Sequence, residues 1–426
     1  MKQRLLGALI AAAITGTATA EAASPPSAEE MWRIIQAQQK QIEQLKRQLE
    51  AAEEKVEATG EMLDELASGA PAPGGEEKAA LGAALGAAHT PFEHGRAGRT
   101  IVGGYGELHY NNLEGDGGAS DKNEIDFHRA ILFLGHEFSD RIRFFSEIEY
   151  EHAAIDNSSS GGVYLEQAYL EMDINERLRA RAGLLLVPAG FLNEVHEPPR
   201  FYGVERNPVE SNIIPTTWWV GGAMLTGEIA PGWSFDAALH EGMKTSSGSN
   251  YAVRSGRQKT SKAVADDLAF TGRIRWNGLS GLELTAFWQY QSDMTQGTDP
   301  NAGAANLLGV TGVYNTGPFT VKALYARWDL DGTGPAAIGA DRQRGWYIEP
   351  SYKITEKLGL FARYNDWDNQ AGSDSGAAAN TGKRQWNTGL NWWIHPDVVL
   401  KADLEFQDND DGRDRNGFNL GVGYQF

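Results

Sequence analysis

The chain has 426 residues, with 50 glycines, 12 tryptophans, no cysteine and a formal net charge of −19 at pH 7. The lack of cysteine excludes a disulfide framework, so an exported protein of this composition must be stabilised in another way. The acidic balance, with no basic cluster to offset it, argues against a nucleic-acid binder.

Residues 1–23 have the organisation of a secretory signal peptide. Lys2 and Arg4 precede an apolar run from Leu5 to Ile14, and small residues follow it. The run is shorter than the roughly 20 residues that a membrane-spanning helix needs. We therefore expect export with cleavage of this segment. Because no later stretch is long and apolar enough for a spanning helix, a mature protein in a membrane would cross it as strands.

Residues 28–66 are predicted to form a coiled-coil helix. An apolar residue recurs every seven positions, which is the a position of a heptad, whereas the d positions are only half apolar. The repeating residues are Ile35, Ile42, Leu49, Val56 and Leu63. A single solvated helix is the alternative. Residues 67–94 have early Pro and Gly and no periodic core, which predicts a flexible linker.

From residue 95 to 426 the apolar residues recur with a period of two, which is typical of β-strands. Sixteen such runs are separated by turn residues, and short turns alternate with long polar loops along the whole region. The runs lie near 100–112, 123–137, 141–152, 162–173, 178–187, 218–229, 232–241, 264–276, 281–292, 304–315, 318–330, 343–354, 357–368, 382–394, 397–408 and 415–426.

This pattern predicts an all-β fold, a 16-stranded antiparallel transmembrane β-barrel in a bacterial outer membrane. An even strand number leaves both ends of the barrel on the periplasmic side, so the N-terminal segment is expected in the periplasm. Eleven tryptophans lie in this region, mostly near strand ends, as two aromatic girdles would require. Trp393 lies by a short turn and Trp328 towards a long loop, so both are expected in these girdles. A soluble sandwich would need a second apolar face, whereas the alternate positions here are strongly polar.

The last residues, 415–426, form an amphipathic strand that reaches the end of the chain. Its apolar face is expected to contact lipid, and the strand is expected to pair with the first strand and close the barrel. The face consists of Phe418, Leu420, Val422, Tyr424 and Phe426. The terminal aromatic pair, Tyr424 and Phe426, resembles the signal read by the barrel-assembly machinery.

Three segments resemble the porin family named after the phosphate-selective porins O and P. They are "FHRAILFLGHEFSDRIRFFSEIEYEHA" (127–153), "YLEQAYLEMDINERLRARAGLLLVPAGFLNE" (164–194) and "TTWWVGGAMLTGEI" (216–229). The resemblance implies a homotrimeric channel of 16 strands, with a long loop after the fifth strand folded inward to narrow the pore. It also implies contact with outer-membrane lipid and lipopolysaccharide.

Strand alternation assigns a set of charged side chains to the lumen, because a charge facing lipid near the midplane would cost about 2–4 kcal/mol. Rings of charged residues set pore selectivity, so the basic members are candidates for an anion path. The alternative is that they pair with inward carboxylates and only hold the wall together. The predicted pore-lining set is Arg129, Arg143, Glu147, Glu149, Arg179, Arg181, Arg273, Arg275, Arg363 and Lys401.

The loop 188–217 is predicted to be the constriction, because it is too long for a hairpin and contains five prolines. Its candidate residues are Phe191, Glu194, His196, Glu197, Arg200, Glu205, Arg206 and Glu210. Phosphate-selective members of the family are expected to have strongly basic constrictions, whereas this loop has more acid than base. Phosphate selectivity therefore does not follow from the resemblance.

The function predicted from the sequence is an outer-membrane porin for passive diffusion of small hydrophilic solutes and ions, with anions such as phosphate as candidates. The alternative is a structural or adhesive barrel with a plugged lumen and a periplasmic coiled-coil tether. An enzyme is not expected, since no nucleophile motif stands out and the nine histidines are scattered. No cofactor and no metal site are predicted from the residue spacing.

Overall fold

The computed structural model describes residues 99–426, apart from 155–160 and 373–379. The predicted signal peptide (1–23), coiled-coil helix (28–66) and linker (67–94) fall outside the described residues. Among the residues described, no helix has the length and apolar content needed to cross a membrane.

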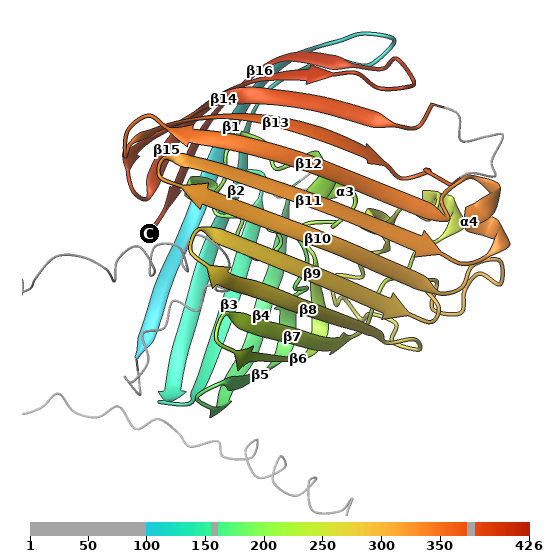
Figure 1. Cartoon of the computed structure of the whole chain (residues 1–426). Helices are drawn as coiled ribbons and strands as arrows, with labels where there is room; N and C mark the ends of the chain where they lie inside the picture. Colours follow the sequence, from blue (N-terminus) through green and yellow to red (C-terminus); the bar gives the residue numbers. More distant parts are fainter. Residues whose placement is uncertain (1–98, 155–160, 373–379) are drawn as a thin grey trace, which may run out of the picture. The chain divides into compact units, whose positions relative to one another are not determined.

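The described residues form sixteen antiparallel strands that close into one barrel in sequence order, as predicted (Figure 1). The strands are β1 (Thr100–Gly115), β2 (Lys122–Ser139), β3 (Ile142–Glu151), β4 (Gly162–Asn175), β5 (Leu178–Leu186), β6 (Trp219–Ala230), β7 (Trp233–His240), β8 (Ala269–Leu279), β9 (Leu282–Gln291), β10 (Ala305–Thr316), β11 (Phe319–Leu330), β12 (Arg342–Lys353), β13 (Leu358–Asp368), β14 (Lys383–His395), β15 (Val398–Gln407) and β16 (Arg415–Gln425).

The two faces of the wall differ in chemistry because side chains alternate along each strand. Large apolar side chains on the outer face are exposed on every side of the barrel, including Leu170, Leu225, Ile274, Val310 and Leu420. The inner face contains buried charged and amide side chains. An apolar outside around a polar inside is the arrangement that a bilayer requires of a spanning barrel.

The last strand closes the barrel as predicted. β16 pairs with β1 from Tyr105 opposite Gln425 to Gly115 opposite Arg415. The backbone of Phe426 exchanges two hydrogen bonds with Gly104, at 3.0 and 2.9 Å. The apolar side chains of β16 are exposed on the outer face. Closure leaves no strand edge that could pair with another chain.

Two long connections fold into the barrel rather than away from it. The first, between β5 and β6, contains η1 (Pro198–Arg200) and α3 (Pro208–Asn212), and Figure 1 shows α3 inside the barrel. The second, between β7 and β8, contains η2 (Ser247–Ser249) and η3 (Val253–Gly256). The short α4 (Thr333–Ala337) lies between β11 and β12. Apolar side chains of both inward connections share one buried cluster with the wall of β9 to β12.

Two sequence predictions need correction. The eighth strand begins at Ala269 rather than near residue 264, because the residues before it belong to the second inward connection. Trp328 and Trp393 are not members of an outer aromatic girdle. Trp328 is fully buried and its Nε1 donates to the Ile213 oxygen, while Trp393 Nε1 donates to the Pro199 oxygen. Both tryptophans instead hold the first inward connection.

Candidate channel site

The first inward connection crosses the barrel and is tied to the opposite wall by its own backbone. Lys401 Nζ donates to the Gly203 oxygen at 2.9 Å, and Arg363 Nη1 donates to the Tyr202 oxygen at 3.2 Å. The Asn391 amide donates to the Phe201 oxygen at 2.9 Å. These wall residues lie on β13 to β15, far around the barrel from β5 and β6. The loop therefore spans the interior.

The α3 end of this loop is held by a buried carboxylate. Asn207 caps the helix, accepting from the backbone N–H groups of Val209 and Glu210. The Glu210 carboxylate accepts from the N–H groups of Phe191 and Leu192 at 2.7 and 2.6 Å and from the Tyr347 hydroxyl at 2.7 Å. Burial raises the pKa of Glu210, although these hydrogen bonds act in the opposite direction. Glu210 thus connects both ends of the loop to β12.

The predicted basic wall residues of β3 and β5 lie together and are paired with carboxylates of β4. Arg143 bonds to Glu171 at 2.9 Å and to Asp173 at 2.7 Å. Arg179 bonds to Asp173 at 2.9 Å, and Arg181 bonds to Glu171 at 2.6 Å. The five side chains form one cross-strand network on the inner wall.

The other predicted basic wall residues are also engaged. Their partners are as follows: Arg129 pairs with Glu107 at 2.8 Å and Glu149 at 3.2 Å, Arg273 with Asp236 at 2.7 Å and with Glu194, Arg275 with Glu283 at 3.6 Å, and Arg363 with Glu349 at 3.2 Å. Lys401 lies over the Phe201 ring, with Nζ 3.5 Å from its centroid. These pairs fit the alternative stated above, in which the basic residues bind inward carboxylates and hold the wall together.

The predicted constriction residues lie in different surroundings. Phe191 packs beside Tyr347, Glu194 pairs with Arg273, and Arg200 lines a cavity. Glu205 binds His109 and Lys122, each at 3.4 Å. Burial acts to raise the pKa of Glu205, but His109 and Lys122 outweigh it and hold this pKa below its usual range. His196 and Glu197 are buried, and Arg206 Nη1 donates to the Thr217 hydroxyl at 2.8 Å.

The second inward connection contributes basic residues that the sequence analysis missed. Arg254 Nη1 donates to the Ser211 oxygen at 2.7 Å, and Arg257 Nη1 donates to the Thr217 oxygen at 2.6 Å. Lys259 Nζ lies 4.0 Å from the centroid of the Tyr164 ring. Together with Arg206 we call these residues the loop cations. Within the described residues, none of the loop cations forms an ion pair. The basic residues within 254–262 were the sequence signal that could have identified Arg254, Arg257 and Lys259, whereas Arg206 was already among the predicted constriction residues.

The loop cations lie within electrostatic range of carboxylates on β3 and β4. Burial lowers the pKa of Arg257, while the charges of Glu166, Glu151 and Glu149 act in the opposite direction. Burial, together with the neighbouring charges of Arg257 and Arg206, lowers the pKa of Arg254 to about 10. Inside the barrel, the loop cations therefore lie near the carboxylates of Glu149, Glu151 and Glu166 on β3 and β4.

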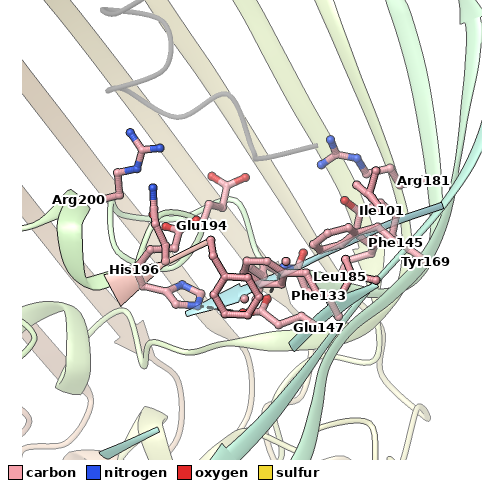
Figure 2. A pocket seen from close by; sticks show the side chains of 18 of the residues that line it. Ile101, Phe133, Phe145, Glu147, Tyr169, Arg181, Leu185, Glu194, His196 and Arg200 are labelled. Atoms are coloured by element: carbon pink, nitrogen blue, oxygen red, sulfur yellow. Dashed lines mark hydrogen bonds and ion pairs between the residues drawn. The ribbon is translucent and has the colours of Figure 1, made fainter. Parts of the chain in front are cut away.

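A cavity of about 390 Å³ lies between the first inward connection and the wall of β1 to β6. Figure 2 shows Glu194, His196 and Arg200 on the loop side, with Glu147 and Arg181 among the wall residues. A second cavity of about 810 Å³ is lined by polar residues of the long connections and the adjoining strand ends, including Asn369, Asp411 and Arg415. Both cavities present charges that suit hydrated, polar solutes.

A closed barrel with an apolar exterior, a charged interior and an inward loop defines an outer-membrane channel of the porin type. Residues 232–412 match the Gram-negative porin family. An uncharacterised protein of Aquifex aeolicus (strain VF5) is 33% identical over 361 residues, which cover 76% of this chain and 79% of that protein. Over residues 232–412 the chain is therefore similar to the Gram-negative porin family, within a barrel of the porin type. It is accordingly a channel protein rather than an enzyme.

Solved porin structures share the fold at low sequence identity. The outer-membrane channel DcaP of Acinetobacter baumannii has a TM-score of 0.55 at 15% identity, covering 79% of this chain and 99% of that chain. OmpF of Salmonella typhi in complex with daunomycin has a TM-score of 0.54 at 12% identity, covering 78% and 98%. The trimer form of OmpT of Vibrio cholerae has a TM-score of 0.51 at 12% identity, covering 78% and 100%.

Proposed function

We propose that this protein is a homotrimeric porin through which small hydrophilic solutes and ions diffuse passively, with a weak preference for anions conferred by the loop cations. The observation that supports this selectivity is a contrast between two basic sets. The predicted wall arginines are paired with carboxylates. Of the loop cations, Arg254 and Arg257 bond to backbone carbonyls, while Arg206 bonds to a hydroxyl and Lys259 lies over an aromatic ring. A cation without a directly paired carboxylate is less neutralised, so more of its field acts on a passing ion.

Phosphate selectivity is not part of this proposal. A phosphate-binding path needs several basic groups free to bind the anion. The wall arginines that could have formed that path are engaged, and Glu149, Glu151 and Glu166 oppose the loop cations. The resemblance to porins O and P therefore supports the barrel plan and the inward loop, and we do not extend it to their substrate.

The assembly and surroundings belong to the same proposal. The likeness to the trimer form of OmpT supports a homotrimer. The exposed apolar face of the barrel supports contact with outer-membrane lipid and lipopolysaccharide. Tyr424 and Phe426 would serve the barrel-assembly machinery. The even strand number supports a periplasmic position for residues 28–66, which would form the coiled coil of the trimer.

Selectivity is tested by the reversal potential across a planar bilayer under a KCl gradient. Lys259→Gln and Arg206→Gln each remove a loop cation, and each should shift the reversal potential towards cation preference. Arg327→Gln is the matched control, because Arg327 pairs with Asp329 and both side chains are about 40% exposed. Unchanged potentials in both loop variants, or shifts towards anion preference, would contradict the proposed role of the loop cations.

A further inference from the structure

Three side chains from separate segments lie close together where the first inward connection (the loop between β5 and β6) contacts the wall. They are Glu147 on β3, Glu166 on β4 and His196 on the loop, and their ligand atoms all lie within 4.8 Å of one another. All three are almost fully buried, with exposed fractions of 1%, 1% and 3%. Figure 2 shows His196 on the loop beside the wall strand that holds Glu147.

The wall presents two adjacent carboxylates here because of a β-bulge. In the β3–β4 register, Glu147 lies opposite Gln167, while Ile148 lies opposite Leu165. Glu166 is therefore the extra residue of the bulge. A bulge re-aims the side chain that it inserts, so Glu166 and Glu147 both point towards His196. Regular alternation would have sent Glu166 and Gln167 to opposite faces.

One ring nitrogen of His196 faces the two carboxylates. His196 Nδ1 lies 3.1 Å from the Leu192 oxygen, which can only accept, so Nδ1 is the donor of this hydrogen bond. Nε2 is then the nitrogen that lies 3.6 Å from Glu147 Oε1 and 3.8 Å from Glu166 Oε2. An imidazole that donates its other N–H to a backbone carbonyl is the usual arrangement for a metal-binding histidine.

The carboxylate oxygens of Glu147 and Glu166 that face His196 have no hydrogen-bond donor, although both are buried. Glu147 Oε1 and Glu166 Oε2 are buried and accept no hydrogen bond, although Gln167 satisfies the other oxygen of Glu147 at 2.6 Å. Within the described residues, His196 is the only group within ion-pair distance of either carboxylate. Unpaired buried anions are costly, and a bound cation offsets that cost.

The geometry points to a site for a divalent transition-metal ion, with Glu147, Glu166 and His196 as its protein ligands. Zinc binds imidazole nitrogen and carboxylate oxygen at about 2.0–2.2 Å, so two ligands of a tetrahedral ion lie about 3.4 Å apart. The two spacings from His196 Nε2, 3.6 and 3.8 Å, need to contract by only a few tenths of an ångström, and all three ligand atoms lie within 4.8 Å of one another. Glu147 and His196 also line the 390 Å³ cavity, which gives an ion a path and room for a water as fourth ligand.

An ion at this site would fasten the inward loop to β3 and β4. The spacing of residues in the sequence did not suggest this metal site, because its three ligands come from three separate segments. The position of one ligand, Glu166, also depends on a β-bulge. A second group, Asp126, His128 and His152, also has metal-ligand geometry but is partly exposed. Its two histidines both direct Nδ1 at Asp126, at 3.0 and 2.8 Å, so this group is already satisfied internally.

Zinc binding to the full-length protein in detergent, freed of metal with a chelator, tests the proposal by calorimetry. We expect one tight site per chain, weakened by about 100-fold or more in His196→Gln and in Glu166→Gln. His136→Gln is the matched control and should bind zinc normally, because His136 contacts Thr100 outside both groups. Circular dichroism verifies that each variant is folded.

X-ray absorption at the zinc edge of the unmodified protein gives a readout that does not depend on any variant. One imidazole nitrogen with two carboxylate oxygens is the expected ligand set. No tight site would overturn the proposal. A tight site that survives both His196→Gln and Glu166→Gln but is lost in His152→Gln would also overturn it, since zinc would then bind at the partly exposed group.

Discussion

At the scale of single residues, the predicted wall arginines of the interior are paired with carboxylates. Each predicted wall arginine has a carboxylate on a neighbouring strand or on the loop, as Arg273 has in Asp236 and Glu194. Alternation along a strand tells which face a side chain occupies, but it says nothing about the partner across the strand gap. For that reason the residues facing inward were predictable, while the choice between an anion path and a wall network was not.

Glu210 accepts the hydrogen bonds that hold both ends of the first inward loop against β12. Its removal would leave two backbone N–H groups and the Tyr347 hydroxyl buried without an acceptor. Leaving a buried donor unsatisfied costs about 1–3 kcal/mol. We expect Glu210→Ala to lower the free energy of unfolding by about 3 kcal/mol, measured by urea unfolding in detergent. Glu210→Gln keeps an acceptor and should cost less than about 1 kcal/mol; equal losses in both variants would refute the role of these hydrogen bonds.

The pH dependence of stability follows from the raised pKa of Glu210. Since the folded pKa exceeds the unfolded value near 4.3, folding binds a proton in the window between the two. The contribution of Glu210 is therefore fully present below the unfolded pKa and is lost as the pH rises through the folded pKa. The unmodified protein should lose stability relative to Glu210→Gln as the pH rises from about 4 through the folded pKa of Glu210. A relative gain over that interval would show that the sign is wrong.

At the scale of elements, the first inward loop crosses the barrel from β5 and contacts the opposite wall at β13 to β15. Val204 near its middle packs against β16, where a Cβ added at Gly421 would lie 3.1 Å from a Val204 methyl carbon. The N–H of Val204 donates to Asp403 on β15 at 2.7 Å. The middle of the loop is thus fixed against the neighbouring strands β15 and β16.

Engineered cysteines can test this contact, because the chain has no cysteine of its own. Val204→Cys combined with Gly421→Cys should form a disulfide on oxidation, since the two Cβ atoms would lie in the range of about 3.5–4.5 Å that a disulfide needs. The control pairs Val204→Cys with Phe418→Cys, which faces outward on the same strand and should not cross-link. Thiol titration measures the outcome. Free thiols in the first pair would mean that the loop does not lie against β16.

The strands were predictable because each one alternates over enough residues to define its faces, and short turns mark one end of the barrel. The inward position of residues 241–268 was not predictable, because a polar loop has the same kind of sequence whether it faces water or a charged lumen. The bulge at Glu166 was also missed, since one inserted residue leaves the alternation on either side intact. Trp328 was misassigned for a related reason. A tryptophan near a strand end suits both a membrane interface and an interior hydrogen bond.

At the scale of the whole molecule, closure explains how one chain satisfies both a bilayer and a hydrated interior. Every strand has two hydrogen-bonded neighbours, including the β1–β16 pair. The exposed apolar side chains then meet lipid without leaving unpaired backbone groups. This level of organisation follows from periodicity and strand number alone, so it was the most completely predictable part of the molecule.

The central claim is that the lumen conducts although two loops enter it. Single-channel recording of the unmodified protein in a planar bilayer tests this claim most directly. We expect discrete conductance steps that close in threes, because each barrel of a trimer would contain its own channel. Folded protein that gives no conductance would contradict the account and would favour the plugged structural barrel instead.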